Sequence, residues 1–218
     1  MLTSERLQAI ADFIDESDYV ADIGADHGKL IIEIANKFPK NRYLAVENKK
    51  GPFDNLQNSV KNYNFNKNIE CSLSDGIDYL PDYVNTLVFS GMGGFNVIEI
   101  ILKNEEKLKN IKKIVFSVHR NFYDLEFFLK YRGYFHANHK FVTESGQNYL
   151  IFDVRFNEKN VFVPFLNPKK NENEQNTLKS EEKITLNPKN KEEIKKLLLN
   201  KLHKYTKSYF ETGISYED

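Results

Sequence analysis

Residues 19–28 read Tyr-Val-Ala-Asp-Ile-Gly-Ala-Asp-His-Gly, and this stretch decides how the rest of the chain is interpreted. Its apolar start predicts a short buried strand, and its polar, glycine-containing end predicts the loop that follows. Apolar residues then recur at helical spacing over 30–35. An amphipathic helix is expected over residues 7–14, with Thr3 or Ser4 as its cap. Strand, loop and helix in this order indicate the opening of a parallel α/β fold.

The same alternation continues downstream. Further strands are expected at residues 43–46, 69–73, 86–89 and 114–116, and further helices near 51–63, 97–102 and 125–129. Residues 135–142 and 149–156 flank the short turn Glu144-Ser-Gly146, so they should pair as an antiparallel hairpin. The expected fold class is therefore α/β, with a Rossmann-like, seven-stranded, mostly parallel sheet and helices on both faces. This arrangement resembles the class I methyltransferase fold more than an ordinary dinucleotide dehydrogenase.

The pattern of elements divides the chain into two parts. Residues 1–163 form the expected Rossmann-like cofactor-binding domain, and residues 164–218 form a linker with a C-terminal helical extension. From Asn167 to Asn190 the chain is rich in Asn, Lys and Glu, which is typical of a linker or a weak helix. Apolar residues beyond it share one helical face. The sequence leaves open whether that final helix grips a nucleic acid backbone or only packs on the domain.

The composition narrows the class of protein. The 218 residues include 31 basic and 31 acidic side chains, so no overall field attracts nucleic acid and any RNA contact must come from local patches. The single cysteine excludes an internal disulfide framework and a multi-cysteine zinc site, and we expect no metal. No long apolar run and no signal-peptide pattern occur, so we expect a cytoplasmic protein without membrane contact. The sequence indicates no obligate protein partner and leaves the oligomeric state open.

Carboxylates in the loop after the first strand indicate which cofactor it holds. Gly24 and Gly28 would let a ligand approach the backbone closely. A pyrophosphate-binding loop usually avoids carboxylates, but this loop carries Asp22 and Asp26 and departs from the Gly-x-Gly-x-x-Gly pattern. S-adenosylmethionine has a sulfonium and an ammonium, so the charges favour it over NAD. We expect His27 to shape the loop; the alternative for the aspartates is that they only cap the following helix.

Acidic residues also end the next two strands. Glu47 ends the second strand, at the spacing where an acid binds ribose hydroxyls in Rossmann-like folds, and Asn48 follows it. Asp75 and Gly76 follow the third strand, where a carboxylate could accept from an adenine amino group. Each acid alone could be an ordinary surface residue. Acids at three successive strand ends indicate one cofactor that spans them.

The fourth strand ends in Ser90-Gly-Met-Gly-Gly94, where the acceptor should meet the methyl group. We expect Gly91, Met92 and Gly93 to contact the cofactor and Gly94 to contact the substrate. The loop is not of the Asp/Asn-Pro-Pro-Tyr type, which suits methylation of an exocyclic amino group. A ring nitrogen has an available lone pair at neutral pH, so no specialised base is required, and no catalytic residue is assigned.

Together these motifs resemble the bacterial tRNA (adenine-22-N1)-methyltransferases, the TrmK family. The resemblance runs from the amino terminus to about Phe165 and rests on the following segments: Ser4-Glu-Arg-Leu7, Asp22-Ile-Gly-Ala-Asp-His27, Glu47, Gly51-Pro-Phe53, Asp75-Gly76 and Ser90-Gly-Met-Gly-Gly94. It implies a class I enzyme that uses S-adenosylmethionine to methylate N1 of an adenosine in tRNA, giving 1-methyladenosine. The rivals are a methyltransferase for a small molecule or protein, a nicotinamide-dependent oxidoreductase, and a non-catalytic RNA-binding module.

Two departures from the family pattern affect the expected substrate site. The tail looks shorter and less regular than the family's two-helix coiled coil. The segment Ser117-Val-His-Arg-Asn121 stands where relatives tend to have Gln-Pro-Asn, so Asn121 matches and His119 occupies the proline position. We expect Arg6, Gly94, Arg120 and Asn121 to bind the substrate, with the arginines as phosphate contacts. Phe122 or Tyr123 could stack on a base, and core packing is expected for at least one of them.

Overall fold

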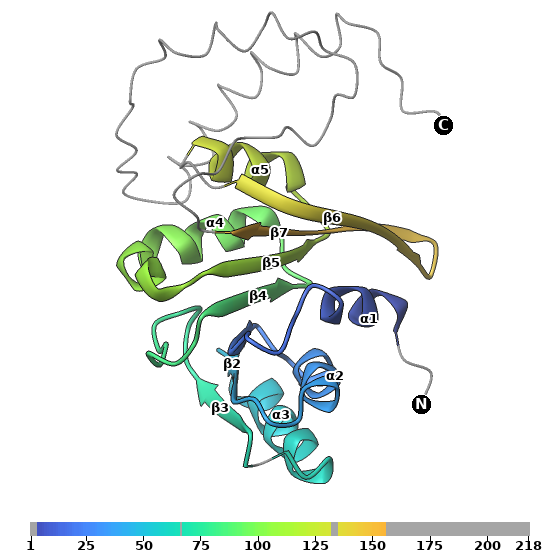
Figure 1. The fold of residues 1–218 in the computed structure, drawn as a ribbon, viewed down its shortest axis with the longest axis vertical. Helices are drawn as coiled ribbons and strands as arrows, with labels where there is room; N and C mark the ends of the chain where they lie inside the picture. The colour runs from blue at the N-terminus through green and yellow to red at the C-terminus, as the bar shows by residue number, and fades with distance from the viewer. Residues whose placement is uncertain (1–3, 66, 132–134, 156–218) are drawn as a thin grey trace, which may run out of the picture. The chain divides into compact units, whose positions relative to one another are not determined.

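The computed structural model describes residues 4–65, 67–131 and 135–155. Its first half alternates helices and strands: α1 (Glu5–Ala11), β1 (Val20–Ile23), α2 (Lys29–Lys37), β2 (Tyr43–Glu47), α3 (Lys50–Asn62) and β3 (Ile69–Leu73) (Figure 1). The second half contains β4 (Thr86–Ser90), α4 (Gly94–Lys103), the 3-10 helix η1 (Glu105–Asn110), β5 (Lys113–Val118), α5 (Phe122–Tyr131), β6 (Phe135–Glu144) and β7 (Gln147–Arg155). The expected linker and C-terminal helix lie outside the described residues.

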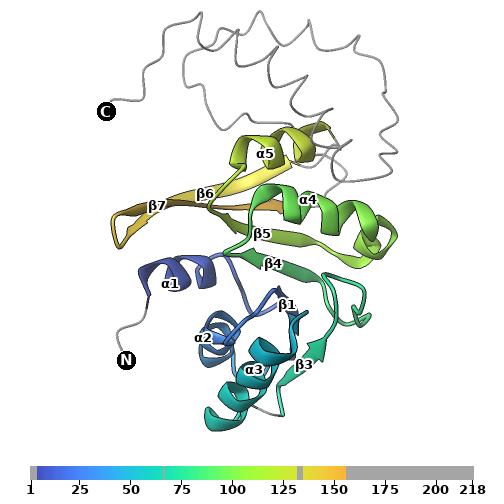
Figure 2. The same ribbon diagram turned by 180° about the vertical axis from the view of Figure 1, so that it is seen from behind.

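The seven strands form one sheet in the order β3-β2-β1-β4-β5-β7-β6. Neighbouring strands from β3 to β5 are parallel, and β7 is antiparallel to both β5 and β6. The chain order reverses between β1 and β4, which is the topological switch point where open α/β sheets bind their ligands. The prediction of a seven-stranded, mostly parallel, Rossmann-like sheet is confirmed, and Figure 2 shows the same sheet from behind.

Both faces of the sheet are covered by helices. Val88, Val115 and Ile151 belong to one buried apolar cluster with residues of α1, α2 and α3. On the other face Phe152 of β7 meets Phe122 of α5 edge to face, with ring centroids 5.5 Å apart. Successive strand residues point to opposite faces, so a strand between two helical layers is apolar throughout. Within the described ranges, no helix is both long and apolar enough to cross a membrane.

The structure differs from the sequence prediction in three respects. The first helix ends at Ala11, although Ile14 beyond it is still buried. The 3-10 helix after α4 was not predicted. The hairpin strands run on to Glu144 and Gln147, because Ser145 and Gly146 both have positive φ and close a two-residue turn. That turn type matches the twist of paired strands, so pairing continues up to it.

Candidate cofactor and substrate site

The expected cofactor residues lie at the carboxyl ends of four neighbouring strands. Residues 22–28 end β1 and lead into α2, and Glu47 and Asn48 end β2. Asp75 and Gly76 follow β3, whereas Gly91, Met92 and Gly93 join β4 to α4. The expected substrate residues are placed as follows: Gly94 begins α4, Arg120 and Asn121 join β5 to α5, and Arg6 belongs to α1. Because the carboxyl ends of parallel neighbours meet at one edge, the fold gathers these loops there.

Glu47 anchors the loop between β1 and α2. The residue is only 7% exposed, and its carboxylate Oε2 accepts a hydrogen bond from the Asp26 backbone N–H at 3.2 Å. Oε1 accepts from the backbone N–H groups of Asn48 and Lys49, at 3.0 Å each. A carboxylate offers about four acceptor sites. Oε2 therefore keeps room for one more donor, such as a hydroxyl, while Glu47 holds two loops in place.

We expect Glu47→Ala to destabilise the protein even without any ligand. Three backbone N–H groups lose a charged acceptor, and water replaces it only in part, so the free energy of unfolding should fall by about 2 kcal/mol. A loss of this size lowers the melting temperature by about 4–8 °C in a domain of this length. Thermal unfolding followed by circular dichroism measures it.

Asp54→Ala is the matched control, since Asp54 is an exposed acid that pairs with Lys50 along helix α3. Exposed pairs of this kind contribute under about 0.5 kcal/mol. Equal melting temperatures for the Glu47 and Asp54 variants would show that Glu47 does not anchor the loop.

Asp22 is the buried acid of the site. It lies next to the end of β1 and is 2% exposed. Burial raises the pKa of its carboxyl to about 7, the positive charge of Arg6 opposes that rise, and the negative charge of Glu47 adds to it. A carboxyl with a pKa near neutrality changes charge when a cation comes to lie beside it. The charge of Asp22 can therefore respond to an ammonium or sulfonium.

The loops after β1 and β4 lie next to each other. A Cβ atom added at Gly24 would lie 3.5 Å from the sulfur of Met92, whereas one at Gly91 would meet no atom within 4 Å. The imidazole Nε2 of His27 lies 3.7 Å from the carboxylate of Asp26, and both side chains are largely exposed. The Met92 side chain therefore lies beside the backbone of Gly24, whereas the backbone at Gly91 is open.

Asp75 is held by two neighbours, one of which the sequence did not indicate. The Asn48 amide donates to Oδ1 at 3.3 Å, and the Lys103 ammonium donates to Oδ2 at 3.2 Å. Lys103 also lies 3.0 Å from Asp78. No sequence pattern links Lys103 at the end of α4 to a loop 28 residues earlier. These side chains are exposed, so the pairs orient Asp75 more than they stabilise the fold.

The loops after β4 and β5 are locked together. The Gly94 backbone N–H donates to the carbonyl of Arg120 at 2.8 Å, and Gly93 forms a parallel bridge with Arg120. A Cβ atom added at Gly94 would lie 2.2 Å from the carbonyl oxygen of Asn121. Asn121 itself has a φ of 57°, a left-handed conformation that asparagine tolerates better than most residues. Gly94 therefore joins the two loops through its backbone.

Aromatic and basic side chains surround that junction. Phe122 packs on Phe152 in the core, whereas Tyr123 is 50% exposed. Phe122 and Tyr123, which the sequence did not distinguish, thus differ in their packing and exposure. Arg120 is exposed, and His119 is half-buried. Burial and the positive charges of Arg120 and Arg6 lower the pKa of His119, which favours its neutral form.

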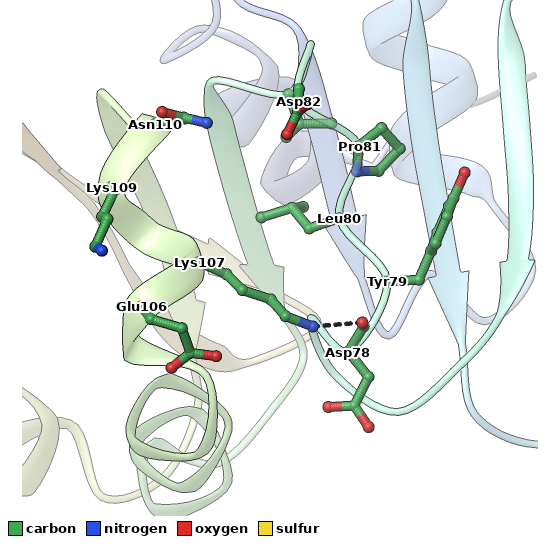
Figure 3. Close-up of a pocket in the computed structure, with 10 residues that line it drawn as sticks. Asp78, Tyr79, Leu80, Pro81, Asp82, Glu106, Lys107, Lys109 and Asn110 are labelled. Atoms are coloured by element: carbon green, nitrogen blue, oxygen red, sulfur yellow. Dashed lines mark hydrogen bonds between the residues drawn. The ribbon is translucent and has the colours of Figure 1, made fainter.

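A hollow of about 410 Å³ begins at Asp78, a little further along the chain than Asp75. The loop after β3 and the helix η1 line it, and the Lys107 ammonium donates to the backbone carbonyl of Asp78 across it (Figure 3). None of the expected site residues lines the hollow. Within the part of the chain that the structure describes, no cluster of His, Cys, Asp and Glu is placed to hold a metal ion.

The sheet order, the hairpin and the glycine-containing loops at the switch point define the class of protein: a Rossmann-like methyltransferase domain. The family model described as "Methyltransferase domain" matches residues 3–152. The chain belongs to this family.

Individual relatives are more distant. The chain is 26% identical over 113 residues to the tRNA (adenine(22)-N(1))-methyltransferase of Bacillus subtilis. This match covers 51% of this chain and 48% of that protein. It is 27% identical over 145 residues to the "Putative tRNA methyltransferase MG248" of Mycoplasma genitalium, with 64% of each covered. The match thus spans about half the length of the first relative and under two thirds of the second.

Among solved structures, M. capricolum TrmK in complex with S-adenosyl-homocysteine superposes with a TM-score of 0.66. The sequence identity is 21%, and the match covers 77% of this chain and 74% of that one. At this identity the likeness shows the fold.

Proposed function

We propose that this protein is an S-adenosylmethionine-dependent methyltransferase that modifies N1 of an adenosine in tRNA, at position 22. The observation that carries the proposal is the placement of Asp22, Glu47 and Asp75 at three successive strand ends, beside the glycine-containing loops after β1 and β4. The family membership and the names of the Bacillus and M. capricolum relatives support the same activity. A tRNA substrate also makes a cytoplasmic location part of the proposal.

The residues present fit this cofactor. The free acceptor site on Glu47 suits a ribose hydroxyl, and the exposed carboxylate of Asp75 suits an adenine amino group. Asp22 provides negative charge for the ammonium and sulfonium, and Gly91 leaves room for close approach. When bound, S-adenosylmethionine supplies an electrophilic methyl group. NAD fits less well, because its pyrophosphate would meet carboxylates in this loop.

The chain's own residues have to orient the acceptor base. The target adenine must leave its stack before its Watson–Crick edge can reach the loop of residues 90–94. The half-exposed ring of Tyr123 can stack on that base, and the exposed Arg120 can contact a phosphate. Ring N1 already has a lone pair at neutral pH, so no side chain has to remove its proton. Positioning then accounts for most of the expected rate enhancement.

Incubation with S-adenosylmethionine and an unmodified tRNA that carries adenosine at position 22 should yield 1-methyladenosine. A tRNA with guanosine at this position should yield none. Mass spectrometry of the nucleosides measures the product under mild conditions, because 1-methyladenosine rearranges to the N6 isomer in base.

Three outcomes would contradict the proposal in distinguishable ways. N6-methyladenosine as the first product would refute the ring nitrogen as acceptor. Cofactor binding without methylation of any tRNA would point to a small-molecule or protein substrate. A folded protein that binds tRNA but not S-adenosylmethionine would be an RNA-binding module.

A further inference from the structure

Arg6 is enclosed by parts of the chain that are far apart in sequence. Its guanidinium Nη1 donates to the hydroxyl of Ser90 at 2.9 Å, at the start of the loop after β4. Its Nε lies 3.7 Å from the carboxylate of Glu144, and its guanidinium carbon lies 5.1 Å from the ring centroid of Tyr149. The side chain is only 20% exposed. A phosphate-binding arginine normally presents its donor fork to solvent, whereas this guanidinium faces the protein.

Glu144, at the end of β6, attaches helix α1, which carries Arg6, to the β6–β7 hairpin. Its Oε1 accepts from the Ser4 hydroxyl at 2.5 Å, and the Ser4 hydroxyl in turn accepts from the Leu7 N–H at 3.2 Å as the cap of α1. Figures 1 and 2 show α1 beside the hairpin. The Ser4 hydrogen bond lowers the pKa of Glu144, as does the charge of Arg6, so Glu144 stays ionised. Arg6 therefore links the hairpin to Ser90, the first residue of the loop of residues 90–94.

The charge of Arg6 also reaches the centre of the candidate site. It acts on Asp22 of β1, where it opposes the rise of the pKa, and on His119 after β5, where it lowers the pKa. The other charge acting on Asp22 is that of Glu47 on β2. Asp22, Ser90 and His119 lie at or beside the carboxyl ends of β1, β4 and β5, which are adjacent in the sheet. One partly buried cation thus acts on three strand ends.

We propose that Arg6 is a positioning residue, which fixes the loop of residues 90–94 against the β6–β7 hairpin and favours the ionised form of Asp22, and that it does not bind the tRNA backbone itself. The inference rests on the proposed function. It replaces a direct phosphate contact for Arg6 with an action through Ser90 and Asp22.

Arg6→Met tests the proposal, since methionine keeps an unbranched apolar stem and removes the charge and the donors. With tRNA and S-adenosylmethionine, kcat should fall about 10-fold to 100-fold, as expected for the loss of a charge-assisted hydrogen bond. The KM for tRNA and its salt dependence should not change, because no phosphate contact is lost. Arg42→Met is the matched control, since Arg42 stacks on Tyr83 just before β2 and should leave all these values unchanged.

Cofactor titration against pH separates the two roles of Arg6. The affinity of the wild type for S-adenosylmethionine should rise as Asp22 loses its proton around pH 7. In Arg6→Met the midpoint should move to higher pH, whereas in Arg6→Lys, which keeps the charge, it should stay near that of the wild type. Ser90→Ala should lower kcat without moving the midpoint, and adding it to Arg6→Met should reduce kcat no further.

Hydrogen exchange of the free protein provides a readout that needs neither cofactor nor tRNA. The backbone N–H groups of Gly91 and Gly94 donate to Ser117 and Arg120, and they should exchange faster in Arg6→Met. If Arg6→Met does not fold, Arg6→Lys and Ser90→Ala carry the same comparison. A raised KM with a flatter salt dependence and an unchanged kcat would overturn the proposal, as would an unshifted pH midpoint. A wild type without cofactor binding or tRNA methylation would refute the proposed function instead, and the exchange result would still test the loop.

Discussion

Gly94→Ala is expected to lower the melting temperature of the protein by about 6–12 °C and to abolish methyl transfer. The added Cβ would lie 2.2 Å from the carbonyl oxygen of Asn121 and 2.9 Å from its carbonyl carbon. These are backbone atoms, so the strain cannot be relieved by a side-chain rotation. Separating the two loops also breaks the hydrogen bond from Gly94 to Arg120. Overpacking of this kind costs about 3 kcal/mol, which corresponds to the stated change in melting temperature.

Gly51→Ala is the control for the Gly94 variant. Gly51 lies in the first turn of α3, and a Cβ atom there would meet nothing within 4 Å. Alanine is the better helix former by about 1 kcal/mol, so this variant should melt at or slightly above the wild-type temperature. A Gly94→Ala protein that melts within about 1 °C of the wild type and keeps its activity would show that the two loops do not need this close approach.

Asp22→Asn is expected to stabilise the free protein at pH 8 while weakening its binding of S-adenosylmethionine at least tenfold. The folded-state pKa of Asp22 is raised from 3.8 to about 7, so between these values the folded protein holds a proton that the unfolded chain has lost. The free energy of unfolding therefore falls as the pH rises through this window, by about 4 kcal/mol in total. Asparagine carries no charge and avoids that loss. The weaker binding follows because the amide cannot attract the ammonium and sulfonium.

Urea denaturation of the free protein at pH 4 and pH 8 measures the first effect, and isothermal titration measures the second. The advantage of Asp22→Asn should be present at pH 8 and nearly absent at pH 4, where the wild-type carboxyl is protonated in the folded state. Asp82→Asn, at an exposed position, should change stability by less than about 0.5 kcal/mol at either pH. A destabilised Asp22→Asn protein at pH 8 would mean that the charged carboxylate is well compensated in the free state.

The sequence by itself determined the sheet and the edge at which the site lies. Buried strands appear as short apolar runs, and glycines and acids follow them, so the order of strands, loops and helices is visible in local patterns. Once the strands are parallel, their carboxyl ends meet at one edge. Asp22, Glu47 and Asp75 could therefore be proposed together as cofactor contacts before any contact was known. The prediction erred where a local turn sets a boundary, as at Ala11 and at the Ser145–Gly146 turn.

Only the tertiary structure decided what each of these side chains does. The hydrogen bond from Ser4 to Glu144 joins residues 140 positions apart, and neither residue carries a pattern that indicates the other. The three bonds of Glu47 and the contact between Gly94 and Asn121 likewise depend on how separate loops pack. The pKa of Asp22 is raised mainly by burial, which is a property of everything packed around it. Sequence periodicity records the spacing of neighbours along the chain, whereas these contacts exist only after folding has brought distant segments together.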